Sequence, residues 1–183
     1  MAEKLKNKKR GLFIMKVGIE AINFYGGSAY VDVKELADYR GLDMARFNNL
    51  LMKEKTVVMP FEDPVTYGVN AAKPSIDSLT DEEKNRIEMV ITCTESGIDF
   101  GKSISTYIHD YLGLKRNCRL LEVKNACYSG TAGFQMAINF ILSKTSPGAK
   151  ALVIAADIAR FMTVDGGTAL SEDTSFVAVS YTH

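Results

Sequence analysis

The sequence predicts an α/β fold built around a largely parallel β-sheet. Two observations carry this prediction: short apolar runs alternate along the chain with amphipathic stretches, and helix-capping residues separate them. Strands that alternate with helices are typical of parallel sheets, because each parallel connection has to cross back over the sheet. The 183 residues contain no internal repeat, low-complexity tract or linker, so we expect one domain with a sizeable core.

The first third of the chain is expected to hold one strand and two helices. The strand covers residues 16–24, where apolar residues alternate with others until a pair of glycines ends the run. A helix is expected next, because Asp32 and Glu35 have the spacing of a capping box and Gly41 is a typical C-terminal stop. Asp43 is the expected start of a second helix.

Two further helix starts are visible in the middle of the chain. Asp63 is a cap with Pro64 in the first turn, and Pro74 is expected to bend or end the helix that follows. Thr80 and Glu83 have the spacing of another capping box. The helix after Asp63 has an apolar stripe formed by Val65, Val69, Ala72 and Ile76.

The remaining elements alternate regularly. We expect strands at residues 87–93, 120–123 and 151–156, and a helix at residues 134–142 between the last two. Between the first two strands, another amphipathic helix is indicated by apolar and aromatic residues at helical spacing: Ile104, Tyr107, Ile108, Tyr111 and Leu112.

The run over residues 132–142 is unusually apolar for a helix. Its only polar side chains are Gln135 and Asn139, one turn apart, so nearly its whole circumference is apolar. We therefore expect this helix to be buried on most sides, with the sheet on one face and other protein on the second.

Cys127 lies between the expected strand at 120–123 and this apolar helix. A thiol at a helix N-terminus faces unpaired N–H groups and the positive end of the helix dipole, which stabilise the nucleophilic thiolate. Gly130 and Gly133 allow other backbone to come close. The alternative is that Cys127 is a small apolar core residue, as we expect for Cys93 and Cys118.

Glu95 stands just past the end of the expected strand at 87–93. Because functional sites of parallel α/β sheets gather at the carboxyl ends of strands, Glu95 and Cys127 are expected to converge if their strands are neighbours. A glutamate beside an acylated cysteine is suited to remove a proton from the carbon next to the thioester carbonyl. The alternative is that Glu95 caps a turn or lies in solvent.

Composition excludes several other classes of function. Twenty-two basic and twenty-two acidic residues cancel, which gives no electrostatic case for nucleic acid or membrane binding. No segment approaches the ~20 consecutive apolar residues of a membrane span. Three irregularly spaced cysteines form no disulfide framework, so we expect a reducing, cytoplasmic setting. Residues 1–14 are expected to be a basic extension to a domain at residues 15–183.

Several motifs together resemble one family. They are TESGID at residues 94–99 with Lys102 and Ser103, NACYSGTA at 125–132, VGIEA at 17–21 and AADIA at 155–159. In this order they resemble the 3-hydroxy-3-methylglutaryl-CoA synthase family of the thiolase superfamily, over residues 15–173. KEK at 53–55 and EDPVTYG at 62–68 resemble most the branch that acts in bacterial polyketide β-branching.

The resemblance implies a fold and a mechanism. The fold is the N-terminal half of a thiolase-like domain, with a mixed, mostly parallel sheet and a buried helix after the nucleophile. Cys127 would accept an acetyl group, and Glu95 would deprotonate the acetyl methyl as general acid/base. The enolate would then add to the β-ketone of a second thioester, and hydrolysis would release the product. Asp157 matches an acidic family position and would be a supporting residue rather than a reactant.

The resemblance also implies partners. Acetyl and β-ketoacyl groups would arrive as thioesters on acyl carrier protein, or on coenzyme A in the mevalonate branch, and the full-length family would form homodimers. No cofactor and no metal are implied.

The chain departs from the family at its C-terminal end. The family uses a histidine of its second half to bind the acceptor, and neither His109, expected on the surface or at an interface, nor the terminal His183 matches it. The match also decays after Asp173. We therefore expect a truncated N-terminal half that is unable to complete condensation alone. The alternatives are a non-catalytic remnant that binds a carrier protein or dimerises, and a ketoacyl synthase or thiolase.

Overall fold

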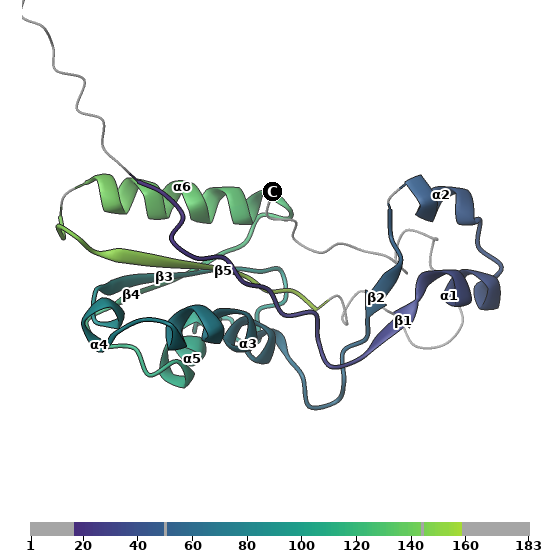
Figure 1. Ribbon diagram of the computed structural model, residues 1–183, viewed down its shortest axis with the longest axis horizontal. Helices are drawn as coiled ribbons and strands as arrows, with labels where there is room; N and C mark the ends of the chain where they lie inside the picture. The colour runs from purple at the N-terminus through teal and green to yellow at the C-terminus, as the bar shows by residue number, and fades with distance from the viewer. Residues whose placement is uncertain (1–16, 50, 144, 159–183) are drawn as a thin grey trace, which may run out of the picture.

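A three-stranded sheet with helices on both faces forms the main body of the protein, and a smaller lobe extends from it (Figure 1). The computed structural model describes residues 17–49, 51–143 and 145–158. The expected extension at residues 1–14 and His183 lie outside these ranges.

The sheet has the order β4-β3-β5, and both pairings are parallel. Strand β3 (Ile87–Cys93) is central, with β4 (Arg119–Val123) and β5 (Lys150–Ala155) on either side. The three strands expected at residues 87–93, 120–123 and 151–156 are thus confirmed to within a residue or two. Six of the seven residues of β3 are buried, all but Glu88, because both faces of the strand are covered.

Helices α3 (Pro64–Asp77), α4 (Asp81–Lys84) and α5 (Ile104–Tyr111) lie on one side of the sheet (Figure 1). The core between α3, α5 and the sheet includes Ile76, Val90, Ile104, Ile108 and Ile154, each at most 4% exposed. The predicted caps are confirmed: Asp63 accepts from the N–H of Thr66, and Thr80 and Glu83 form a complete capping box.

Pro74 does not end its helix, contrary to one of the two expected outcomes. Helix α3 continues through Pro74 to Asp77. Proline removes one backbone donor near the C-terminus, but Ile76, in the same turn, packs into the core and holds that turn against the sheet.

Helix α6 (Tyr128–Leu142) lies on the other side of the sheet and runs back along it, antiparallel to the strands (Figure 1). Its buried residues are Ser129, Gly130, Gly133 and Ala137, which face the sheet. The expected burial on most sides is not seen: Met136 and Ile138 are 39% and 40% exposed. Among the described residues, the sheet covers one face of α6, and nothing covers these two side chains as a second layer.

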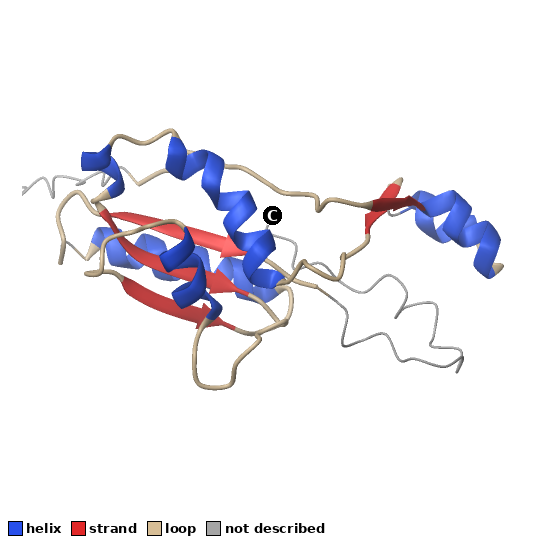
Figure 2. Cartoon of the chain, turned by 90° about the horizontal axis from the view of Figure 1, so that it is seen from below, coloured by secondary structure: helices blue, strands red, loops and turns tan. Residues whose placement is uncertain are grey.

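The lobe is formed by residues 30–56. Strands β1 (Tyr30–Asp32) and β2 (Glu54–Thr56) pair antiparallel, and α1 (Val33–Arg40) and α2 (Met44–Asn49) lie between them in sequence. Both views show this lobe beyond the edge at which β3 and β5 end (Figures 1 and 2). The predicted cap and stop of α1 are confirmed, since Asp32 accepts from the N–H groups of Lys34 and Glu35 and Gly41 is left-handed.

The strand expected at residues 16–24 is wrong for its described part. Residues 17–29 form no strand, and Ile22 and Phe24 are 82% and 90% exposed. The segment is attached by side chains instead, with Glu20 bound to Lys150 at 2.6 Å. Alternating apolar residues permit a strand, but a strand also needs a hydrogen-bonded neighbour, and no described residue pairs with this segment.

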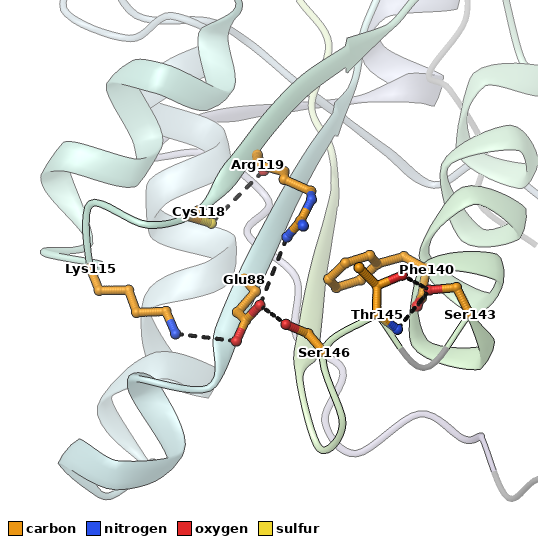
Figure 3. A network of polar contacts seen from close by, with 8 residues as sticks. All are labelled: Glu88, Lys115, Cys118, Arg119, Phe140, Ser143, Thr145 and Ser146. Atoms are coloured by element: carbon orange, nitrogen blue, oxygen red, sulfur yellow. Dashed lines mark hydrogen bonds and ion pairs between the residues drawn. The ribbon is translucent and has the colours of Figure 1, made fainter.

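Glu88 links the opposite edge of the sheet, where β3 begins. It accepts from Ser146 and approaches Lys115 at 3.5 Å and Arg119 at 3.8 Å (Figure 3). Glu88 therefore connects β3 with the start of β4 and with the segments before β4 and β5. The Ser146 hydroxyl, followed by the charge of Lys115, lowers the pKa of Glu88. This end of the sheet is therefore held by ion pairs and hydrogen bonds as well as by the strand ladder.

Candidate active site

Three loops meet at the edge where the strands end, which we call the carboxyl edge. Cys93 pairs in register with Val123 of β4 and with Ala155 of β5. The N–H of Thr94 donates to the carbonyl of Val123 at 3.1 Å, and the N–H of Ala156 donates to the carbonyl of Cys93 at 3.2 Å. The residues that follow these three strands therefore emerge side by side.

All three residues singled out from the sequence lie on these loops. Glu95 follows β3 by two residues, Cys127 follows β4 by four, and Asp157 follows β5 by two. Since β3 and β4 are paired neighbours, Glu95 and Cys127 reach the carboxyl edge from adjacent strands. Adjacent strands are the condition under which the two residues were expected to converge.

Cys127 is exposed and occupies the N-cap position of α6. The turn before it is tight: the N–H groups of Tyr128 and Ser129 donate to the carbonyls of Asn125 and Ala126. Ala126 has a φ of +44°, a left-handed conformation that side chains other than glycine rarely adopt. This turn presents the sulfur at the positive end of a 15-residue helix, where negative charge is stabilised.

Asp157 fastens the loop that carries Glu95. One carboxylate oxygen, Oδ1, accepts from the hydroxyl of Thr94 at 2.8 Å, from the N–H of Glu95 at 2.6 Å, and from both the N–H and the hydroxyl of Ser96 at 3.1 Å each. The Ser96 hydroxyl also donates to the carbonyl of Ile158 at 2.7 Å. Asp157 therefore fixes the backbone from which the Glu95 side chain projects.

Two more carboxylates hold the rest of this loop, and the sequence reasoning did not single out either as a site residue. Glu122 of β4 accepts from the N–H of Ile104 at 2.7 Å, and Asp99 accepts from the N–H groups of Gly101 and Lys102. Those two N–H bonds lower the pKa of Asp99. The only signal for Glu122 is an acidic residue inside an otherwise apolar strand, which is too weak to identify a partner.

A cavity of about 330 Å³ adjoins the same loop. It lies between the start of α3 and the residues that follow Glu95 and Asp157. Its lining consists of Glu62, Asp63, Pro64, Ser96, Gly97, Ile98 and Ile158.

The other two cysteines behave as the sequence suggested. Cys93 is fully buried under α6, and burial raises the pKa of its thiol to about 11. Burial also raises the pKa of Cys118. Both thiols therefore stay protonated near neutral pH, when only the thiolate is an effective nucleophile.

His109 is half-buried near the C-terminal end of α5, and its Nε2 bonds to the carbonyl of Lys115 at 2.8 Å. Helix α5 starts beside the Glu95 loop, so His109 lies toward the opposite end and takes no part in the carboxyl edge. Within the described ranges, no group of three or more His, Cys, Asp or Glu side chains has the arrangement of a metal site.

Comparison with known proteins gives the family. The family described as "Hydroxymethylglutaryl-coenzyme A synthase N terminal" matches residues 13–178. The chain belongs to the hydroxymethylglutaryl-coenzyme A synthase family. This membership confirms the resemblance, and it decides against a ketoacyl synthase or a thiolase.

Relatives within the hydroxymethylglutaryl-CoA synthase family include both branches. The chain is 72% identical over 167 residues to the polyketide biosynthesis 3-hydroxy-3-methylglutaryl-ACP synthase PksG of Bacillus subtilis, covering 91% of this chain and 40% of PksG. It is 38% identical over 154 residues to the hydroxymethylglutaryl-CoA synthase of Enterococcus faecalis, covering 84% of this chain and 39% of that enzyme. The chain thus spans about two fifths of the length of these synthases.

Solved synthase structures confirm the predicted fold class. A structure of PksG from Bacillus subtilis superposes with a TM-score of 0.74 at 77% identity, covering 77% of this chain and 35% of that one. The curacin pathway HMG synthase in complex with acetyl donor-ACP gives 0.75 at 68% identity, covering 78% and 35%. The described residues form the thiolase-like α/β arrangement of these N-terminal halves. No helix in the described ranges combines the length and apolarity needed to cross a bilayer.

Proposed function

We propose that this chain carries the acetyl-accepting and proton-abstracting residues of a hydroxymethylglutaryl-ACP synthase. The observation that carries the proposal is the carboxyl edge itself. An exposed thiol stands at the N-terminus of α6, after strand β4, and β4 pairs with β3, the strand that leads into the Glu95 loop. Family membership supplies the reaction type, an acyl transfer followed by carbon–carbon bond formation.

The proposed reaction begins at Cys127. Its thiolate attacks the acetyl carbonyl of a thioester, and the carrier leaves as a free thiol. Glu95 then takes a proton from the acetyl methyl, which leaves an enolate held on the cysteine sulfur. The enolate adds to the β-ketone carbon of the second thioester, and the new alkoxide takes up the proton that Glu95 holds. Water finally cleaves the bond between the cysteine sulfur and the acyl group.

Asp157 is proposed to support this chemistry without touching the reacting atoms. By accepting four hydrogen bonds from residues 94–96, it limits the positions that Glu95 can take. Proton transfer needs a donor and an acceptor within hydrogen-bond distance. A fixed loop keeps the Glu95 carboxylate close to that geometry.

The donor is proposed to be an acetylated acyl carrier protein in the cytoplasm. PksG is named a polyketide biosynthesis ACP synthase, and the curacin synthase was solved with its donor ACP. Relatives solved with coenzyme A ligands are 33% and 34% identical, against 68% to 77% for these two. All three cysteines are free, which suits a reducing compartment.

Intact-protein mass spectrometry tests the first step. After incubation with acetyl-ACP or acetyl-CoA, we expect one acetyl adduct on the wild type and on Cys118→Ala, and none on Cys127→Ala. Cys118 is the matched control because it is a free but half-buried thiol. Absence of the adduct from all three proteins would favour the non-catalytic remnant that binds a carrier protein or dimerises.

A further inference from the structure

Ser129, two residues after Cys127, has an unusual hydroxyl group. Its side chain is fully buried, and its Oγ is the one buried side-chain oxygen or nitrogen in the described residues that has no hydrogen-bond partner. Ser105, also fully buried, shows the ordinary case, because its hydroxyl bonds to that of Ser103. A buried polar group without a partner costs stability, and native proteins seldom keep one without a functional reason.

The packing of α6 shows where this hydroxyl lies along the sheet. Gly133 is so close to β3 that a Cβ added to it would stand 2.5 Å from the Cys93 sulfur. Ser129 is four residues earlier on the same buried face of the helix. Four residues of helix advance about 6 Å toward the carboxyl edge, which equals about two residues of a strand. Ser129 is therefore level with the start of the loop that carries Glu95, just beyond Cys93.

Glu95 offers acceptor atoms that no described residue uses. Its N–H is held by Asp157 at 2.6 Å, but its carboxylate accepts no hydrogen bond from any described residue, and its oxygens, unlike the Oγ of Ser129, are open to solvent. An unpaired hydroxyl and a free carboxylate thus lie toward the same end of the sheet, one at the start of α6 and the other on the loop after β3.

We propose that Ser129 is a positioning residue for Glu95. Its hydroxyl donates a hydrogen bond to the Glu95 carboxylate in the acetylated enzyme and aims the free carboxylate oxygen at the acetyl methyl. The inference rests on the proposed function, because it assumes that Glu95 removes a proton from acetyl-Cys127. It explains why a polar residue occupies a sheet-facing position that is otherwise held by glycine and alanine.

Deuterium uptake separates this step from acetylation. The full chain is acetylated, transferred to D₂O and quenched, and the mass of the acetyl group on the Cys127 peptide is followed with time. We expect Ser129→Ala to acetylate to the same extent as the wild type but to exchange its methyl protons about tenfold more slowly, because one hydrogen bond to a charged group is lost. Glu95→Gln provides the reference for lost exchange.

Urea unfolding of the same variants separates positioning from structure. Ser129→Ala is expected to unfold at a midpoint no lower than the wild type, since it removes an unpaired buried hydroxyl, while Ser105→Ala unfolds at a lower midpoint. Slower exchange with unchanged stability supports the inference.

The contrary results are distinct from one another. Equal exchange in wild type and Ser129→Ala overturns the inference and leaves the proposed function standing. A Ser129→Ala midpoint that falls like that of Ser105→Ala overturns it too, because the hydroxyl is then a structural bond. A wild type that acetylates but exchanges no deuterium overturns the proposed role of Glu95 together with that of Ser129.

Discussion

Single carboxylates do most of the positioning at the carboxyl edge and around it. Asp157 gathers four donors on one oxygen, and Glu62, only 3% exposed, gathers donors from two segments of the chain. The two oxygens of Glu62 accept from the N–H groups of Ser28 and Met59 and from the hydroxyl of Tyr25. Each carboxylate adds side-chain hydrogen bonds to the packing and the other hydrogen bonds that join these segments.

Replacing Asp157 is expected to loosen the Glu95 loop. Asp157→Ala leaves four donors without this acceptor, and we expect it to lower the free energy of unfolding by about 3 kcal/mol. Asp157→Asn keeps one acceptor oxygen and should cost less. Urea denaturation measures the difference, with the exposed Asp110→Ala as the control. If Asp157→Ala lowers the free energy of unfolding no more than the control does, Asp157 does not hold the Glu95 loop in place.

Glu62 makes stability depend on acid pH. The N–H of Met59, together with Ser28 and Tyr25, lowers the pKa of Glu62 from its ordinary 4.5. Because the folded-state pKa is depressed, its stabilisation is complete above pH 4.5 and is lost as the pH falls through the folded value. Glu83, Glu88 and Asp99 act in the same direction.

We therefore expect thermal stability to fall below pH 4.5, and to fall less steeply in Glu62→Gln. Melting curves between pH 3 and 6 measure this, with the exposed Glu82→Gln as the reference. Parallel curves for the wild type and Glu62→Gln would refute the assignment.

At the scale of elements, the decisive contact is between α6 and β3. Gly133 has no side chain, and α6 therefore lies directly on Cys93, Val153 and Ile91. This close approach fixes how far from the sheet the turn before α6 places Cys127.

Gly133→Ala tests that contact. Alanine favours a helix over glycine by about 1 kcal/mol, but its Cβ would lie 2.5 Å from the Cys93 sulfur and 3.2 Å from Val153. We expect a net loss of about 2 kcal/mol, because overpacking outweighs propensity. Gly18→Ala, with open space around it, should be neutral. A stabilised Gly133→Ala would show that α6 is free to move away from the sheet.

The sequence was most informative where one local signal is sufficient. Helix caps at Asp32, Asp63 and Thr80 and the run of β3 are visible in the chain because their causes lie within a few residues. Cys127 was recognisable for the same reason, as the junction of a strand with a helix. Its role and that of Glu95 stay predictions.

Features that depend on distant partners escaped prediction. The three-residue strands β1 and β2 are too short to show a period, and residues 17–24 show the period but have no described neighbour to pair with. The roles of Ser129 and Glu122 depend on how α6 and β4 lie relative to the Glu95 loop. No short sequence pattern predicts that arrangement.

At the scale of the whole molecule, the two faces of the sheet are unequal. Among the described residues, helices α3 and α5 bury one face in an extensive core, while α6 alone covers the other (Figure 1). Met136 and Ile138 of α6 are apolar and exposed. Exposed apolar surface on a helix favours contact with other protein.

We expect copies of the chain to associate through the outer surface of α6. Ile138→Lys should lower the sedimentation coefficient at a given concentration, because a charge replaces a 40% exposed apolar side chain. Asn139→Lys adds the same charge at the next, already polar position. Analytical ultracentrifugation showing a compact monomer for the wild type would contradict the expectation.

The lobe at residues 30–56 leaves the main body and returns to it at one point, since the N–H of Val57 donates to the carbonyl of Ala29 at 2.9 Å. Val33 and Ala37 pack there with Leu42, Met44 and Met52 as a miniature core separate from the one beneath the sheet. The two ends of the lobe are therefore close enough for a tight turn to join them. Replacing residues 30–56 with two or three glycines between Ala29 and Val57 would leave the path of β3, β4 and β5 to the carboxyl edge unaltered.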